Sequence, residues 1–321
     1  MTVESVSVVI PCYNASAFLG EALESALNQT HRPHEIIVVD DGSTDDSATL
    51  AHAYDEVTVI SQHNQGESVA RNRGIDEATG RWIAFLDADD VWKPSKLERQ
   101  LAAVTQDPSP DEIVAVHTNI FVFGIRSDVT RFETIDPTTR YSPVQLAKLN
   151  VFRSPSAMLV RRDCSPRFPT WTRHAEDLVY CLDLVKQGRI KLVEDALTGH
   201  RQHSSNQSSQ AATRIGWHQT ICRWVAENAQ ALTVEAKSEM EDAGLRKVAS
   251  AAWEYKAHRD WENYWTIREY LEQYRGTATV DLVLNNKIHP TWVYSWWDAA
   301  RRFASLGFAK KNTSRTRVLN D

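Results

Sequence analysis

Residues 86–90, with the sequence LDADD, place three aspartates within four positions at the end of the apolar run RWIAFL. Ionised carboxylates at this spacing repel one another, and burial adds a desolvation cost. The arrangement therefore needs protons, hydrogen-bond donors or a cation. Hard divalent ions such as Mg²⁺ or Mn²⁺ bind a few carboxylate oxygens and complete their shell with water and substrate phosphates. These residues predict metal-assisted binding of a phosphorylated substrate.

The elements that position LDADD are short strands that alternate with helices over the first hundred residues. Continuous apolar runs, typical of strands buried on both faces of a parallel sheet, occupy 5–10, 35–40, 57–61 and 82–86. Stretches with helical spacing lie between them, at 15–29, 47–54 and 67–78. This pattern predicts a doubly wound α/β domain, in which ligands bind beyond the carboxyl ends of the strands. Two further polar clusters, PCYN and DDGSTDD, fall at such ends.

The pattern changes after about residue 113. We expect antiparallel strands on either side of a turn near 124–128, a further strand at 156–162, a helix at 175–186 and a last strand in KLVEDAL. The polar segment 200–213 is expected to be a loop or hinge. The remainder is expected to be helical, with one apolar stripe formed by Ala257, Trp261, Tyr264, Ile267, Leu271 and Tyr274.

Composition gives few signals about partners. The net charge of −6 gives no whole-chain signal for nucleic acid. The four cysteines lack CxxC spacing and are expected to be reduced thiols. The N-terminal sequence lacks the features of a signal peptide, and no run approaches the ~18 apolar residues of a membrane span. We expect a cytoplasmic protein, either free or peripheral at the inner face of the membrane.

Seven segments occur in an order that resembles the family 2 glycosyltransferases of the GT-A fold. They are VSVVIPCYN, VVDDGSTDD, NQGESVARNRGIDEATG, FLDADD, SAMLVRR, AED and HRQH. The resemblance implies a GT-A domain at 1–205 and leaves 206–321 as a C-terminal α-helical region. It implies an inverting, metal-dependent transfer from a nucleoside-diphosphate sugar, for which we expect a UDP-sugar, to a glycan or lipid-linked acceptor. The expected cofactor is Mn²⁺ or Mg²⁺, and the expected role is surface polysaccharide or glycolipid synthesis.

The resemblance assigns roles to the aspartates of LDADD. Asp87 would contact the ribose of the donor, and Asp89 would bind the metal. An aspartate-rich turn is also a common surface feature, but here it adjoins a buried strand and two other polar clusters. A metal that bridges the two phosphates would neutralise the charge that develops on the departing nucleoside diphosphate.

The resemblance also implies a pocket for the base of the donor. Asp41, with Asp40 beside it, would face the base, although these residues could instead cap the following helix. Pro11, Tyr13 and Asn14 would line the same pocket, with the ring of Tyr13 available for stacking. The alternative is an ordinary turn between a strand and a helix.

Three residues are expected to serve the diphosphate and the acceptor. Arg71 would pair with DADD or the diphosphate, unless it is simply solvated. Asp177 would be the general base that deprotonates the acceptor hydroxyl, and Glu176 would orient it or contact the acceptor. Acidic residues in a first helical turn also complement the helix dipole without any further function.

The late HRQH segment supplies the last candidates. In the family, Arg201 and His203 approach the diphosphate or the metal when a loop closes, so His203 is a predicted metal ligand. Histidines in polar loops are more often solvated. Gly66 and Gly74, which flank the ARNR sequence, are expected to permit close packing.

Two other classes of protein remain as alternatives. FLDADD also resembles the aspartate motif of haloacid-dehalogenase-like phosphatases, and a nucleotide-sugar-binding module without turnover would keep the same fold. The tryptophan-rich segment 291–311 combines aromatic and basic residues. That composition suits a membrane surface or a homo-oligomer contact as well as a packed helical core.

Overall fold

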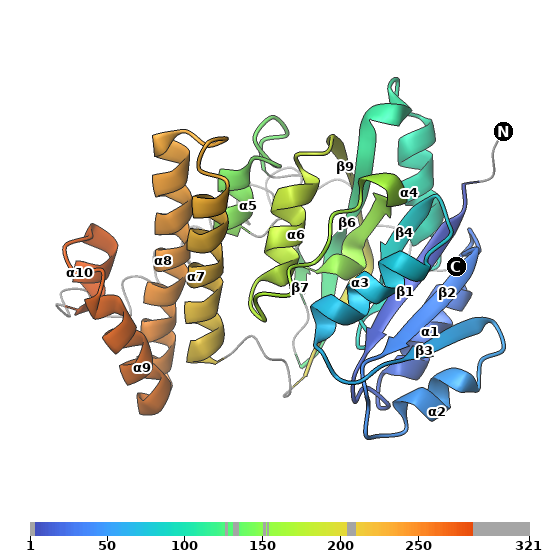
Figure 1. Cartoon of the computed structure of the whole chain (residues 1–321), viewed down its shortest axis with the longest axis horizontal. Coiled ribbons are helices and arrows are strands. Elements are labelled where there is room, and N and C mark those ends of the chain that lie inside the picture. Colours follow the sequence, from blue (N-terminus) through green and yellow to red (C-terminus); the bar gives the residue numbers. More distant parts are fainter. Residues whose placement is uncertain are drawn as a thin grey trace, which may run out of the picture. The chain divides into compact units, whose positions relative to one another are not determined.

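The protein is described by a computed structural model, which covers residues 4–125, 128–130, 135–149, 152, 154–203 and 210–284. Strands and helices alternate along the first hundred residues, as predicted, and helices follow residue 210 (Figure 1). The strands are β1 (Val6–Cys12), β2 (Glu35–Asp40), β3 (Val57–Ser61), β4 (Trp82–Phe85), β5 (Val91–Trp92), β6 (Ile113–Gly124), β7 (Asp128–Thr130), β8 (Met158–Arg161) and β9 (Arg189–Gln202). The helices are α1 (Leu19–Leu27), α2 (Ser47–His52), α3 (Glu67–Glu77), α4 (Lys96–Thr105), α5 (Pro143–Leu149), α6 (Glu176–Leu184), α7 (Ala211–Glu227), α8 (Val234–Ala257), α9 (Trp261–Glu272) and α10 (Ala278–Leu284).

Within the described residues, the strands form one mixed sheet in the order β3-β2-β1-β4-β8-β6-β9-β5, with β7 paired to β6. β1 to β4 are parallel, β8 runs antiparallel to β4 and β6, and β9 is parallel to β6. The carboxyl ends of β1, β2, β4, β6 and β9 therefore share one edge with the start of β8. This edge is where the polar clusters lie.

Helices cover both faces of the sheet. One core packs α3, α5 and α6 against residues such as Val9, Ile37 and Phe85. The other packs α1, α2 and α4 against the alternate residues of the same strands, including Val8 and Ile36. Burial on both faces explains the continuous apolar runs in the sequence.

The run at 57–61 is less buried than the sequence predicted. β3 is the edge strand, and its residues are half-buried or exposed. Within the described residues β3 pairs with β2 alone, which leaves its other side without a strand.

The segment at 200–213 also departs from the expected loop. His200 to Gln202 belong to β9, which pairs with β6 up to the match of Gln202 with Gly124. β5 adds to the other side of β9, with Val91 opposite Gly199. Pairing with β6 holds His200 to Gln202 in an extended form, which local composition does not reveal.

The contacts divide the chain into two compact units, 1–209 with 216–244, and 210–215 with 245–321. The division at residue 205 that the motifs indicate stays a prediction. The described part of the second unit has its own core, in which Tyr264, Ile267 and Leu271 are buried as predicted. Trp261 of the same predicted stripe is 49% exposed, which corrects that expectation.

Among the described residues, no helix is both long enough and apolar enough to cross a membrane. The tryptophan-rich segment 291–311 lies outside the described residues.

Candidate active site

The DADD turn is fixed at the carboxyl edge of the sheet by the segment that leads into β8. The backbone N–H of Asp87 donates to Ser156 Oγ at 2.9 Å, and Ser154 Oγ lies 3.3 Å from Asp87 Oδ2. Ser156 belongs to the short 3₁₀ turn Pro155–Ala157, directly before β8. Because β8 runs antiparallel to β4, its beginning lies beside the end of β4, where DADD starts.

Asp89 faces the end of β9. Its Oδ2 lies 2.9 Å from Nε2 of His203, and its carbonyl oxygen accepts a hydrogen bond from Nε of Arg201 at 2.9 Å. Burial raises the pKa of Asp89, and the charges of Asp90 and Asp87 act in the same direction, whereas His203 lowers it. A cation at this carboxylate would relieve the same repulsion.

Asp90 is the buried anchor of the turn, with 1% exposure. Its Oδ1 accepts a hydrogen bond from the backbone N–H of Arg201 at 3.1 Å and lies 3.2 Å from Nδ1 of His200. Its Oδ2 accepts from Ser154 Oγ at 3.1 Å. One carboxylate thus ties the DADD turn to both β9 and the start of β8.

Arg71 joins the DADD turn to α6. Its guanidinium is 3% exposed, donates to Asp87 Oδ1 at 2.8 Å, contacts Glu67 and lies 3.9 Å from Oε1 of Glu176. Burial alone would lower the pKa of Arg71, but these three carboxylates raise it, so the group stays charged. Its Nε and its second terminal nitrogen are buried without a hydrogen-bond partner. Buried donors of this kind suit an anionic ligand oxygen.

The start of α6 carries the predicted acceptor residues. The helix follows Ala175, whose φ of 57° lies in the left-handed region, and begins at Glu176. Burial raises the pKa of Glu176, and the adjacent Asp177 contributes in the same direction. Since Glu176 lies next to Arg71, the structure brings the start of α6 to the DADD turn.

Asp41 is 2% exposed and holds the segment that leads into α3. Its Oδ1 accepts hydrogen bonds from Gln62 Nε2 and Gln65 N, at 2.7 and 2.9 Å, and its Oδ2 accepts from Gly66 N at 2.8 Å. The carboxylate thus ties the end of β2 to the loop before α3. Oδ2 accepts one of these bonds and has capacity for another.

Asn14 joins the loop after β1 to the loop after β2. Its backbone N–H donates to Ser43 Oγ at 3.0 Å, and its side-chain oxygen accepts from Thr44 N at 2.8 Å. Its φ of 50° is in the left-handed region, which asparagine tolerates better than most residues. Asn14 therefore shapes the rim of the predicted pocket through its protein contacts.

The other three pocket residues differ in exposure. Pro11 is buried within β1. Asp40 is buried and accepts a hydrogen bond from Ser43 N at 3.1 Å, which is a turn-forming contact. Tyr13 is 51% exposed, so its ring is open to a ligand.

The two glycines beside ARNR serve different purposes. A Cβ at Gly74 would lie 2.2 Å from Cγ1 of Val9, so close packing of α3 on β1 requires this glycine, as predicted. Gly66 meets nothing within 4 Å, which makes the packing prediction wrong there. Its φ of 95° favours glycine instead, and its N–H reaches Asp41.

The donor set at Asp89 and His203 fits a divalent ion. Within the described part of the chain, no three His, Cys, Asp or Glu side chains form a preformed metal site. Asp89 and His203 offer an oxygen and an imidazole nitrogen 2.9 Å apart. Mg²⁺ and Mn²⁺ sites commonly use one or two protein ligands and complete their shell with phosphates. These two residues therefore suit a metal that arrives with a phosphorylated donor.

Sequence reasoning missed four residues of this region: Phe18, Ser154, Ser156 and His200. His200 lies in the HRQH motif, and Ser156 begins SAMLVRR, so both were within the motifs that signalled the site. Ser154 and Phe18 carry no motif signal, because their contacts to DADD and β9 span 64 or more positions of sequence.

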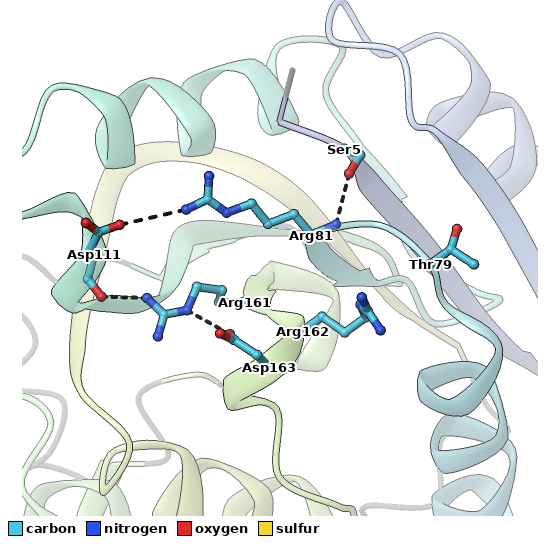
Figure 2. A pocket seen from close by; sticks show the side chains of 7 residues that line it. All are labelled: Ser5, Thr79, Arg81, Asp111, Arg161, Arg162 and Asp163. Atoms are coloured by element: carbon cyan, nitrogen blue, oxygen red, sulfur yellow. Dashed lines mark hydrogen bonds and ion pairs between the residues drawn. The ribbon is translucent and has the colours of Figure 1, made fainter. Parts of the chain in front are cut away.

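A pocket at the opposite edge of the sheet has a different character (Figure 2). It is lined by Ser5, Thr79, Arg81, Asp111, Arg161, Arg162 and Asp163. Arg161 pairs with Asp163 at 2.8 Å, and Arg81 lies 3.8 Å from Asp111. These contacts neutralise charge within the pocket, and none of the predicted site residues lines it.

Comparison with known proteins identifies the family. Glycosyl transferase family 2 matches residues 7–166. An uncharacterised glycosyltransferase of Nostoc sp. is 35% identical over 223 residues, which cover 65% of this chain and 68% of that protein. The chain therefore belongs to glycosyl transferase family 2 and is a glycosyltransferase. This assignment replaces the phosphatase alternative.

Other relatives share parts of the chain or its fold. The putative teichuronic acid biosynthesis glycosyltransferase TuaG of Bacillus subtilis is 43% identical over 101 residues, or 30% of this chain and 40% of TuaG. The structure of S. aureus TarS residues 1–349 superposes with a TM-score of 0.58 at 18% identity, over 84% of this chain and 92% of that one. A Pyrobaculum calidifontis mannosyltransferase, solved with GDP-Man and Mn²⁺, gives 0.53 at 18% identity, over 97% and 88%. These neighbours show the GT-A-like fold.

Proposed function

We propose that this chain transfers a sugar with inversion from a UDP-sugar to a hydroxyl group of a glycan or lipid-linked acceptor. One observation carries the proposal: Arg71 contacts both Asp87 of the DADD turn and Glu176 at the start of α6. It supports a site in which donor and acceptor groups share one charge network. TarS in complex with UDP-GlcNAc, whose TM-score is 0.54, supports a nucleotide-sugar donor on this fold.

The donor would lie along the carboxyl edge of the sheet. Tyr13 would stack on the base, Asp41 would accept from it through Oδ2, and Asp87 would contact the ribose. Asp89 and His203 would hold the divalent metal. When bound, that ion supplies Lewis-acid stabilisation of the diphosphate. The unpaired donors of Arg71 face the same charge network.

One further site residue would act near the diphosphate, and three would act through the loops around the base. Arg201 is held beside Asp89 and carries a positive charge that suits a phosphate oxygen. Asp40, Pro11 and Asn14 would act indirectly, because their observed contacts and burial shape the loops around the base.

The acceptor step would use Asp177 as the general base. As the acceptor oxygen bonds to the anomeric carbon, its proton passes to the Asp177 carboxylate, and the bond from that carbon to the diphosphate oxygen breaks. The nucleoside diphosphate leaves with the electron pair, and a single in-line displacement inverts the carbon. Glu176 would orient the acceptor or Asp177.

The relatives support a role in polymer synthesis. TuaG is named for teichuronic acid biosynthesis, and it is 43% identical to this chain over 101 residues. We therefore propose surface polysaccharide or glycolipid synthesis as the role, with residues 1–205 carrying the transfer chemistry.

Asp177→Asn tests the proposal. A thermal-shift screen of nucleoside diphosphates and nucleotide sugars, with and without Mn²⁺, first selects the donor, because a ligand that binds only the native state raises its apparent stability. Donor hydrolysis, with water as the acceptor, is then followed by UDP release. Removal of a general base costs about 10²–10⁴-fold in rate, whereas UDP affinity should be unchanged.

The matched control is Asp183→Asn, on the same helix but paired with Lys186 and Trp224. This variant should keep its hydrolysis rate. An Asp177→Asn enzyme that also stays within a few-fold of wild type would show that the base lies elsewhere, with Glu176 as the next candidate.

A further inference from the structure

Phe18 lies at the N-cap position of α1, but its side chain does not cap the helix. It is the residue directly before α1, and its side chain makes no capping hydrogen bond. Serine, threonine, aspartate and asparagine are strongly preferred there, because their oxygens accept from the first free N–H groups of the helix. An aromatic residue at this position indicates that contacts elsewhere determine its identity.

Those contacts are with the end of β9. The ring of Phe18 stacks on the imidazole of His203, with centroids 4.8 Å apart and planes inclined by 30°. The guanidinium carbon of Arg201 lies 5.0 Å from the centre of the same ring and 4.5 Å from that of Phe123. One aromatic ring therefore touches both Arg201, on β9, and His203, the residue after β9.

α1 restrains Arg201 at a second point. Glu21, one turn along the helix, accepts a hydrogen bond from a terminal nitrogen of Arg201 at 2.7 Å. The Nε of Arg201 meanwhile donates to the carbonyl of Asp89. The arginine side chain is thus held between α1 and the DADD turn and is 14% exposed.

We propose that Phe18 is a positioning residue of the diphosphate site, whose ring orders His203 and Arg201 for the metal ion and the phosphates of the donor. The inference rests on the proposed function, because it assumes that a nucleoside diphosphate and a divalent ion bind at Asp89. Phe18 itself touches neither the metal nor the reacting atoms. It fixes the rotamers of two long side chains before the donor arrives, which lowers the entropy lost on binding.

The test is calorimetric titration of UDP with and without Mn²⁺, which gives the factor by which Mn²⁺ tightens binding. Phe18→Leu should reduce that factor about fivefold or more, since stacked aromatic and cation–π contacts are each worth roughly a factor of two to ten or more. Phe18→Tyr keeps the ring and should retain the wild-type factor. Phe18→Met has nearly the volume of phenylalanine without its ring, and it should reproduce the loss if Phe18→Leu fails to fold.

Phe123→Leu is the matched control. The Phe123 ring centre lies 4.5 Å from the guanidinium carbon of Arg201, whereas the ring that stacks on His203 is that of Phe18. This variant should weaken UDP binding equally in both conditions and leave the Mn²⁺ factor unchanged. If a folded Phe18→Leu or Phe18→Met protein shows the same Mn²⁺-dependent gain in UDP affinity as wild type, the inference about Phe18 is overturned. The proposed function would not be affected by that result. A wild-type protein whose UDP affinity does not respond to Mn²⁺ would overturn the proposed metal-dependent function, and with it the inference.

Discussion

Replacing Arg71 by methionine should destabilise the fold more than any exposed arginine substitution. The methionine side chain fills similar space but leaves Asp87 and Glu176 without the cation they now share. It also removes the guanidinium from above the Phe168 ring, whose centre lies 5.0 Å from Cζ of Arg71.

The size of the effect follows from burial. Arg71 is 3% exposed, and its partners Asp87 and Glu176 are each 18% exposed, so solvent screens these pairs weakly. Removing one partner of a buried pair costs about 3–5 kcal/mol. Asp87 keeps its contact with Ser154 in the variant, so we expect a loss of stability at the lower end of this range, about 3 kcal/mol. Glu67 is 49% exposed and adds little.

The deficit should depend on pH in a defined direction. Burial raises the pKa of Glu176 in the folded state, and Arg71 opposes that rise, so Arg71→Met should raise this pKa further. A folded state that binds more protons gains stability as pH falls. The loss in Arg71→Met should therefore shrink towards acid, by up to about 1.4 kcal/mol per pH unit while Glu176 titrates.

Urea unfolding followed by tryptophan fluorescence, at several pH values, measures this difference. Arg73→Met is the control, because Arg73 lies on the same helix, is 52% exposed and pairs only with the exposed Glu77. It should cost no more than about 0.5 kcal/mol at any pH. If Arg71→Met also costs less than about 1 kcal/mol, or if its deficit does not vary with pH, the charge network does not stabilise the fold as argued.

Three further changes test other parts of the structure. Asp89→Asn should abolish the gain in UDP affinity that Mn²⁺ provides while leaving metal-free binding intact, and calorimetry showing an undiminished gain would remove Asp89 as the ligand. Burial lowers the pKa of Lys96, so wild type should gain stability relative to Lys96→Met as pH rises towards the ordinary pKa of lysine, by at most about 1.4 kcal/mol per pH unit. Urea unfolding midpoints whose difference does not change with pH would contradict the lowered pKa. Gly74→Ala should cost about 1–3 kcal/mol because the new Cβ meets Val9, whereas Gly20→Ala, where the nearest atom is 3.7 Å away, should be neutral or mildly stabilising in the same unfolding assay.

The sequence predicted the parts of this protein that depend on local pattern. β2 and β3 have the predicted bounds, and the helix at Glu67–Glu77 ends within one residue of its prediction. Apolar runs and turn residues determine these elements, so single-sequence reasoning reaches them. The half-exposure of β3 was missed because strand order, which places β3 at the edge, is a property of the whole sheet.

The candidate site shows the same division. Motifs marked Asp87, Asp89 and the start of α6, but they did not indicate how the groups are held. The contact of Arg71 with Glu176 spans 105 positions of sequence, and the hydrogen bonds of Asp41 reach a loop more than twenty positions away. Tertiary contacts decide which carboxylate is paired and which donor is left without a partner. No local pattern in a single sequence encodes these contacts.

The pairing of β9 within the sheet also affects the stage of synthesis at which this enzyme can form its active site. Asp89 and His203 are separated by 114 positions, and His203 directly follows β9, which is the last strand along the described chain. A nascent chain that has emerged only through β8 exposes the DADD carboxylates, because Arg201 and His203 have not yet emerged. The side of β6 that will pair with β9 is then still open to other strands. Closing such a distant pair is slow, and an open strand edge invites association with other chains. Formation of β9 therefore brings Arg201 to Asp89 and covers the open side of β6 in the same step.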